Sequence, residues 1–343
     1  METRLDLERT TAYLDILLRI CARKGHILVL MQNNPDPDAI ASAAAIRELV
    51  RARLRKRVVI GYGGVFGRAE NRAMVHELGI ETQQVQTEDL ARYRTVCLVD
   101  TQPRSGNNAL FTSRPAEIVI DHHEGSSRRT WAAELADVRP DYGATSTILY
   151  EYVVASGIDL NPNLATALYY GIYSDTSALG RKVSSADLHA FQSLAPLADM
   201  QRLARIRRAP VPPAYFEMLR DSLTNAMLAG NVVVTFIRGC GNPDMFAEIA
   251  EMMVRLEGIR ISICYGACGQ TVYLSARAVD DRGNLAERMR RVMAGIGTGG
   301  GHRSMAGGQA SFGVGERDKR LEQVRVRILR HFAGNREQKR LLP

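Results

Sequence analysis

The chain has 343 residues, of which 45% are hydrophobic and 24% are charged. This length predicts two domains, and the composition excludes a disordered or fibrous protein. The five cysteines, an odd number without the paired spacing of a zinc site, favour a reduced, cytoplasmic protein. No apolar stretch reaches the roughly 20 residues of a membrane helix, and the first ten residues mix acids with bases, unlike a signal peptide. We therefore expect no membrane partner.

The formal net charge of +8 is compatible with nucleic-acid binding, but the charge is unevenly distributed. Residues 51–57 hold five bases and no acid, residues 202–208 hold four bases and no acid, and residues 316–343 hold nine bases and four acids. The rest of the chain is therefore net acidic. Each basic segment taken alone is more typical of a solvated helix face or tail than of a binding site.

Short apolar runs alternate with helical periodicity in the first half of the chain. Runs rich in Val and Ile that lack a polar alternation are typical of parallel strands buried on both faces. The first half is therefore predicted to be an α/β domain with a mostly parallel sheet. The predicted strands are 26–31, 58–64, 95–100 and 117–121, and the predicted helices are 5–23, 40–55, about 69–78, 145–156, 163–175 and 185–198.

No further strong strand signal follows until about residue 225, and three prolines within 207–214 indicate a linker. Beyond it, strands over 231–237, 259–266 and 271–279, with a helix near 243–257, predict a smaller α/β domain. We expect the active site in the cleft between the two domains. The predicted organisation is a larger domain over 1–200, a linker over 201–221, a smaller domain over 222–330 and a basic tail over 331–343.

Acidic residues follow three of the predicted strands. Ligand crevices in open α/β sheets lie beyond the carboxyl ends of the strands. Carboxylates gathered there repel one another unless a cation is present, and oxygen with imidazole ligands suits manganese, magnesium or zinc. Each acid alone is readily explained as a helix cap or a turn residue, but the whole group is not. The group consists of Asp36 and Asp38 after the first strand, Asp100 at the end of the third, and Asp121 with His122 and His123 at the end of the fourth.

A fifth carboxylate, Asp175, lies at the end of a predicted helix. Alone it is an ordinary helix-terminal residue. Together with the acids at the strand ends it would complete a two-metal site. Such sites stabilise the attacking and leaving oxygens of a phosphoryl transfer.

Four segments resemble, in the right order, the motifs of the DHH phosphoesterase family. Residues 297–308, GTGGGHRSMAGG, resemble the phosphate-binding motif of the family's associated C-terminal domain, although a flexible loop would also explain the glycines. Residues 274–278, LSARA, resemble the strand that contributes a substrate-contacting arginine. The four motif segments are NNPDPDAIASA (33–43), LVDTQ (98–102), DHHEG (121–125) and YGIYSDT (170–176).

The resemblance implies a phosphoesterase with two Mn²⁺ ions, for which Mg²⁺ or Co²⁺ could substitute. Asp121 would orient the adjacent histidine, and His123 would face the scissile phosphate. Backbone N–H groups of the glycine segment would form an anion-binding nest. The implied metal ligands are Asp36, Asp38, Asp100 (bridging the ions), His122 and Asp175, and the implied substrate contacts are Arg277, Gly299, Gly300, Gly301 and His302.

Gln32 stands where the first motif of the family usually has a histidine. The side-chain carbonyl of glutamine is a weaker, neutral ligand, so one of the two ions is expected to bind less tightly. Either the enzyme works with a weakened site, or the domain has become a nucleotide-binding sensor with little turnover. Because the other ligand positions are intact, we favour retained catalysis.

The chain most resembles the branch of bacterial nanoRNases that also act on 3′-phosphoadenosine 5′-phosphate. We expect hydrolysis of short RNA, dinucleotides or 3′-phosphoadenosine 5′-phosphate through metal-activated water. The nucleotide sensor and a pyrophosphatase or exopolyphosphatase are the alternatives. A homodimer would be compatible with the family.

Overall fold

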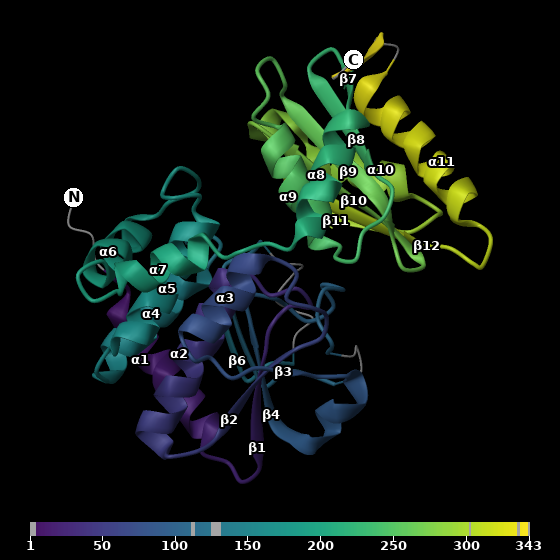
Figure 1. The fold of residues 1–343 in the computed structure, drawn as a ribbon. Coiled ribbons are helices and arrows are strands. Elements are labelled where there is room, and N and C mark those ends of the chain that lie inside the picture. The colour runs from purple at the N-terminus through teal and green to yellow at the C-terminus, as the bar shows by residue number, and fades with distance from the viewer. Residues whose placement is uncertain (1–4, 111–113, 125–131, 302, 335–336, 342–343) are drawn as a thin grey trace. The chain divides into compact units, whose positions relative to one another are not determined.

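The computed structural model describes residues 5–110, 114–124, 132–301, 303–334 and 337–341. The chain divides into two compact units, Met1–Ala209 and Pro210–Pro343, shown in Figure 1. The boundary lies inside the predicted linker 201–221, but most of that segment is helical, in α7 (Met200–Arg207) and α8 (Pro213–Thr224). Pro213 occupies the first turn of α8, where a missing N–H group leaves no hydrogen bond unmade, so the proline-rich segment starts a helix.

The first unit contains a sheet of six parallel strands in the order β3-β2-β1-β4-β5-β6. The predicted α/β class is thereby confirmed, and the four predicted strands correspond to β1, β2, β4 and β5. The strands are β1 (His26–Leu30), β2 (Val58–Tyr62), β3 (Gln83–Gln84), β4 (Tyr93–Val99), β5 (Ile118–Asp121) and β6 (Leu135–Val138).

Strand β6 corrects the expectation that no further strand precedes residue 225. Its sequence, LADV, contains an alanine and an aspartate, both of which are uncommon in strands, so its signal is weak. Asp137 is nevertheless fully buried, because its carboxylate is paired with the guanidinium of Arg139 at 2.7 Å.

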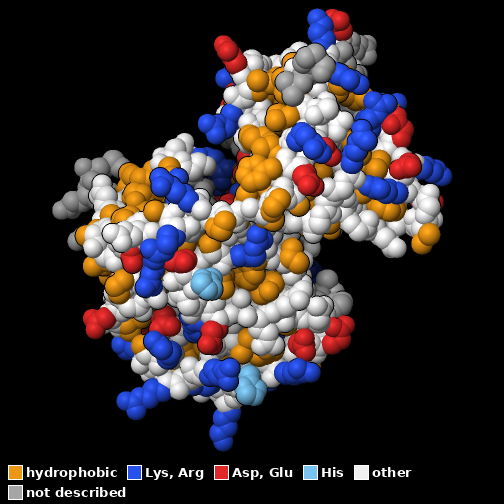
Figure 2. Space-filling model, in the orientation of Figure 1, with side chains coloured by type: hydrophobic (Ala, Val, Ile, Leu, Met, Phe, Trp, Pro, Cys, Tyr) orange, Lys and Arg blue, Asp and Glu red, His pale blue; other side chains and the backbone are white. Residues whose placement is uncertain are grey.

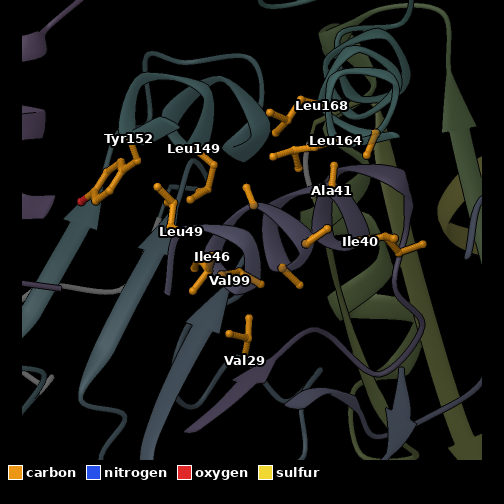
Figure 3. Packing of buried hydrophobic residues seen from close by; sticks show 14 of the residues in the cluster. Val29, Ile40, Ala41, Ile46, Leu49, Val99, Leu149, Tyr152, Leu164 and Leu168 are labelled. Atoms are coloured by element: carbon orange, nitrogen blue, oxygen red, sulfur yellow. The ribbon is translucent and has the colours of Figure 1, made fainter. Parts of the chain in front are cut away.

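Helix α2 packs on the sheet with one side and against α4 and α5 with the other. Asp36 caps its N-terminus by accepting a hydrogen bond from the backbone N–H of Ala39, and Pro37 is its first residue. Figure 3 shows Ile46 of α2 near Val29 and Val99 of the sheet, with Leu149 on the opposite side of the helix. Most sides of α2 carry alanine or other aliphatic side chains, so the helix can be buried against the sheet and against other helices at the same time. The remaining helices of this unit are α1 (Leu7–Cys21), α3 (Ala69–Glu77), α4 (Thr145–Ser156), α5 (Pro162–Asp175) and α6 (Ser185–Leu194), and α2 itself spans Pro37–Leu54.

The second unit is built on a mixed sheet of seven strands in the order β11-β12-β10-β9-β8-β7-β13. Its only parallel pair among the described residues is β8 with β9. The predicted tail contributes β13, which pairs with β7, so part of the tail belongs to the sheet. The elements are β7 (Met227–Ala229), β8 (Val232–Ile237), α9 (Asp244–Met253), β9 (Ile261–Cys268), β10 (Thr271–Ala278), α10 (Leu285–Met293), β11 (Thr298–Gly301), β12 (Met305–Ser311), α11 (Arg317–Ile328) and β13 (Gln338–Arg340).

Among the helices that the structure describes, none is both long and apolar enough to cross a membrane. All five cysteines are free thiols. Figure 2 shows Lys and Arg side chains mixed with Asp and Glu on the visible face of each unit.

Candidate metal centre

The acidic residues of the first unit gather where the strand order of its sheet reverses. Strands β1 and β4 are neighbours, and the sheet grows outward from them in both directions. Asp38 lies in the first turn of α2, which follows β1, and Asp100 directly follows β4. Crevices at such reversal points, beyond the carboxyl ends of the strands, are where open α/β sheets bind ligands.

Asp38 and Asp100 are almost completely buried, with exposed fractions of 1% and 2%. The Asp38 carboxylate accepts hydrogen bonds from the backbone N–H groups of Thr145 and Ser146, both at 2.7 Å. These groups begin α4, so the positive end of that helix faces the carboxylate. The Thr145 hydroxyl donates to Asp100 Oδ1 at 2.9 Å. One helix start therefore holds both carboxylates in place.

His122 links these carboxylates to Asp175. Its Nδ1 lies 3.2 Å from the backbone carbonyl oxygen of Tyr142, an acceptor that assigns the proton to Nδ1. Nε2 then carries a lone pair, and it lies 3.2 Å from Asp175 Oδ2 and 3.6 Å from Asp100 Oδ1. Nε2 is buried and has no hydrogen-bond partner among the described residues.

This arrangement tests whether the residues fit a metal ion. A lone pair facing carboxylate oxygens is repulsive unless a cation lies between them. Burial, with the nearby charge of His123, lowers the pKa of His122 to about 4, so a proton is a poor candidate for that cation. Ligand atoms of Asp38, His122 and Asp175 lie within 4.8 Å of one another, as do those of Asp100, His122 and His123. Carboxylate oxygens with a neutral imidazole suit a divalent ion, so the donor set fits.

Asp121 and His123 form a separate pair beside this group. Asp121 Oδ1 accepts from His123 Nδ1 at 2.8 Å and from the backbone N–H groups of His122 and His123. Burial opposes the charge of both groups, but their hydrogen bond and mutual attraction outweigh it. The pKa of Asp121 is therefore lowered, and the pKa of His123 is raised to about 9. The pair is thus an aspartate and an imidazolium.

The other carboxylates resist ionisation in the metal-free protein. Burial, reinforced by the charges of Asp175 and Asp36, raises the pKa of Asp38 to about 8. Burial and the neighbouring aspartates also raise the pKa of Asp100 well above its usual range. Asp36 has a raised pKa for the same reasons, although it belongs to neither group of potential ligands above. Full ionisation of these groups would place more negative charge in the centre than its own side chains can neutralise, so the metal-free protein keeps protons there.

Three supporting groups were not foreseen from the sequence. Gln102 donates to Asp121 Oδ2 at 2.6 Å and to the His123 carbonyl oxygen at 3.0 Å. The Thr145 hydroxyl and the Tyr142 carbonyl complete the set. Gln102 lies in the motif LVDTQ, which could have indicated it. No local pattern marks Tyr142, because it acts through its backbone.

Gln32 lies between β1 and α2 and is half-buried. Its side-chain oxygen accepts a hydrogen bond from Asn107 Nδ2 at 3.4 Å. This long bond leaves a second lone pair on the oxygen. The Gln32 side chain is therefore anchored only weakly by Asn107.

The predicted substrate residues belong to the second unit. Arg277, on β10, is 14% exposed at its side chain and pairs with Glu251 Oε1 at 3.0 Å. Gly299, Gly300 and Gly301 lie in the edge strand β11 and not in the flexible loop that was the alternative explanation, while His302 lies outside the described residues. A Cβ at Gly299 would approach the Met289 carbonyl oxygen to 2.9 Å, so the close packing of α10 explains that glycine.

Gly300 differs from its neighbours. A Cβ at Gly300 would meet no described atom within 4 Å, whereas one at Gly301 would lie 2.3 Å from the Met305 carbonyl oxygen. Gly301 also has a φ of 133°, in the region that favours glycine. Packing within the unit therefore accounts for Gly299 and Gly301 but not for Gly300.

Comparisons with known proteins agree with this geometry. Residues 26–172 match the model of the DHH family, N-terminal domain. The chain is 34% identical over 294 residues to an uncharacterized protein of Methanocaldococcus jannaschii, which covers 85% of this chain and 59% of that protein. It is 29% identical over 143 residues to a probable manganese-dependent inorganic pyrophosphatase of Staphylococcus aureus, covering 42% and 45% of the two chains. This chain therefore spans about half the length of these relatives.

The fold is also found in a solved structure. A crystal structure of an exopolyphosphatase-related protein from Bacteroides fragilis shares it with a TM-score of 0.67, over 92% of this chain and 96% of that one, at 16% identity. The predicted resemblance is confirmed, while the nanoRNase branch stays a prediction. The segment that matches the DHH family, N-terminal domain, residues 26–172, contains Asp38, Asp100 and His122 of the metal centre.

Proposed function

We propose that this protein is a metal-dependent phosphoesterase. The observation that carries the proposal is the His122 imidazole, whose Nε2 is buried, has no hydrogen bond within the described part of the chain and faces the oxygens of Asp100 and Asp175. Such a set of acceptors is stable around a divalent cation and repulsive without one. The proposed ligands are Asp36, Asp38, Asp100, His122 and Asp175, with Gln32 as a weak additional ligand.

When bound, divalent ions would polarise phosphoryl oxygens and make water a nucleophile at neutral pH. The protein's own residues prepare this centre. The Tyr142 carbonyl keeps the proton of His122 on Nδ1, which leaves Nε2 available as a donor atom. Thr145 orients Asp100, and the first amides of α4 hold Asp38. These contacts pre-organise the ligands before any ion binds.

His123 is the proposed catalytic residue that acts on the substrate. Asp121 keeps its imidazole protonated and fixes its ring through Nδ1. The ring is 35% exposed at the side chain, so its other edge can reach solvent. An imidazolium at this point can donate a hydrogen bond to an anionic phosphoryl oxygen or give a proton to the leaving oxygen.

Arg277, Gly299, Gly300, Gly301 and His302 are the proposed phosphate-binding residues. Glu251 and Ser275 hold Arg277 in a defined position, and its guanidinium would bring a positive charge to a phosphate. The open space beside Gly300 supports a ligand that approaches the backbone closely. Edge strand β11 has unpaired backbone groups along one side, which can accept such a ligand.

The proposed substrates are short oligoribonucleotides, dinucleotides and 3′-phosphoadenosine 5′-phosphate. A second candidate function, inorganic pyrophosphatase, is favoured by the name of the Staphylococcus aureus relatives. The two functions differ in whether the substrate carries a nucleoside. The nucleotide sensor, the homodimer and the cytoplasmic location stay predictions.

A substrate panel tests the proposal. Purified protein would be incubated with Mn²⁺, Mg²⁺ or Co²⁺ and with an RNA dinucleotide, 3′-phosphoadenosine 5′-phosphate, a cyclic dinucleotide or pyrophosphate. We expect release of mononucleotide or phosphate from a nucleotide substrate, lost in His123→Ala. Turnover of pyrophosphate alone would establish the second candidate. Tight nucleotide binding without turnover of any substrate would contradict both functions and establish the sensor.

A further inference from the structure

One cavity of the first unit lies apart from the metal centre. It has a volume of about 780 Å³ and is lined by the C-terminal half of α2, the start of β2, the segment after α3 and the N-terminal ends of α5 and α7. Val58 is the first residue of β2, so the cavity lies at the amino end of the parallel strands. The metal centre lies at their carboxyl ends. The 18 residues of α2, about 27 Å long, run from one site to the other.

The cavity brings together two basic segments that are distant in the sequence. Arg51, Lys56 and Arg57 come from the segment 51–57, and Arg202 comes from the segment 202–208. Arg47 is the fifth cationic side chain of the lining. A pair of basic segments that meet at one cavity is harder to explain as separate solvated helix faces.

The carboxylates of the lining neutralise only part of this charge. Glu48, Glu81 and Asp199 are its three acids, against five cations. Glu48 is shared by two arginines, with Arg51 at 2.7 Å and Arg47 at 3.6 Å. Asp199 caps α7 through Oδ1, which accepts hydrogen bonds from backbone N–H groups, and its Oδ2 lies 3.5 Å from Arg202 Nε in a partly exposed ion pair. The cavity is therefore net positive.

Part of the lining is apolar. Val58, Leu78, Ile80 and Leu164 line the cavity and are themselves buried, with exposed fractions between 3% and 7%. The volume of several hundred Å³ is in the range of small-molecule sites, but eight of the 18 lining residues are charged, so the site favours a charged ligand. A ligand that uses both kinds of side chain has an anionic group and a compact apolar part.

We propose that this cavity is a second binding site for a nucleoside phosphate, separate from the metal centre. Its phosphate would bind between Arg57 and Arg202, and its base would lie against Leu78 and Ile80. Arg202 is oriented for this role by its hydrogen bond to Asn163 Oδ1. No residue of this site is a proposed metal ligand, so the site binds its ligand without a metal ion.

Calorimetric titration of the full chain with AMP tests this site. The titration would be made with Mn²⁺-loaded protein and again after a chelating resin has removed the metal. We expect one AMP site that persists without metal. Adenosine and inorganic phosphate, each carrying half of the ligand, should bind at least tenfold more weakly than AMP. Absence of metal-independent AMP binding at millimolar concentration would overturn the proposal.

Charge-matched variants locate the site. The double variant Arg57→Ser/Arg202→Gln should weaken metal-independent AMP binding at least tenfold, whereas Arg19→Ser/Arg92→Ser, outside the cavity, should change it less than twofold. The single variant Arg57→Ser is the control for misfolding of the double variant, because Arg57 is exposed and its replacement should not disturb the fold. It should still weaken AMP binding severalfold. Equal effects of the two double variants would overturn the proposal.

Hydrogen exchange supplies an independent location. AMP should protect backbone amides within 44–58 and 161–167 in the metal-free protein. Protection confined to 98–102 and 118–124 would place the nucleotide at the metal centre and refute a second site.

Discussion

Two clusters of buried acidic residues in the first unit differ in whether a cationic side chain neutralises them. At the metal centre, Asp38 and Asp100 are buried with no cationic arginine or lysine among their hydrogen-bond partners in the described residues. In the second cluster, Asp137 and Glu151 are fully buried against Arg139, with contacts of 2.7 and 2.6 Å. Both clusters remove carboxylates from water, but only the second supplies its own cation.

The difference separates structural charge from functional charge. Tyr152 and Arg9 also donate to Asp137, and Thr10 donates to Glu151, so the Arg139 cluster is satisfied internally. A buried charge without a partner is costly, and proteins rarely retain one unless an external ion completes it. What distinguishes the metal centre is therefore the lack of an arginine or lysine bonded to its acids among the described residues, and not the presence of acids alone.

The largest expected effect is the loss of stability when the Arg139 cluster is disrupted. Asp137→Asn removes the negative charge that neutralises Arg139 and should lower the free energy of unfolding by about 3–5 kcal/mol. Urea unfolding measures this loss. Arg92→Ser, at an exposed pair with Asp89, should change stability by less than about 1 kcal/mol and serves as the control. A loss of similar size in both variants would show that the Arg139 cluster is not a closed unit.

The same substitution at the metal centre should have the opposite sign. Asp100→Asn keeps the acceptor for Thr145 and removes a buried carboxyl group that at neutral pH must either hold a proton or repel its neighbours, so the metal-free protein should gain on the order of 1 kcal/mol. Because altering even the groups that orient a ligand costs 10–100-fold in affinity, Mn²⁺ binding should weaken by at least about 100-fold. Urea unfolding without metal and Mn²⁺ titration check the two halves. A destabilised metal-free variant that binds Mn²⁺ normally would refute the centre.

The pH dependence of stability should also distinguish the two states of the centre. With pKa values of about 8 for Asp38 and about 9 for His123, the folded metal-free protein holds protons that the unfolded chain releases. Its stability should therefore fall as pH rises, from about pH 4 to 8 for Asp38 and from about 6.5 to 9 for His123, by at most about 1.4 kcal/mol per pH unit for each group. Solvent reduces the share of His123, which is 35% exposed. The lowered pKa of His122, about 4, opposes this loss only below about pH 6.5, so the range from 6.5 to 9 is the one to measure.

Thermal unfolding across this pH range, with chelator and with saturating Mn²⁺, measures the dependence. The bound ion should remove most of the slope, because it replaces the protons. Asp100→Asn should flatten the slope of the metal-free protein. An equal slope with and without Mn²⁺ would mean that the ion does not bind these carboxylates.

The smallest expected effect concerns Gln32. If its weak oxygen ligand limits one ion, Gln32→His should tighten the weaker Mn²⁺ site by roughly tenfold, in the range of single-group effects at metal sites. Metal titration resolves the two affinities, and Gln32→Ala is the matched control that should weaken the same site. Unchanged affinity in both variants would show that Gln32 takes no part in the centre.

Most of the first unit could be predicted from the sequence. Strands β1, β2, β4 and β5 are continuous apolar runs, which is the strongest local signal of a buried parallel strand. Strand β6 was not predicted, because its buried aspartate is compensated by Arg139 and by side chains from other parts of the chain, which a local pattern does not show. Strand β11 was not predicted because its glycines depend on neighbours that only folding supplies: Gly299 packs closely on α10 and Gly301 on Met305, which no local pattern reveals.

The sequence by itself determined the class of the fold and the types of residue available for metal chemistry. Acids that directly follow apolar runs must lie at strand ends, since each strand end is a local property. The tertiary structure alone decided that β1 and β4 are neighbours, that α4 caps Asp38, and that Tyr142 turns His122 Nε2 toward Asp100 and Asp175. It also decided that two basic segments line one cavity, because charge complementarity acts between side chains that only folding brings together.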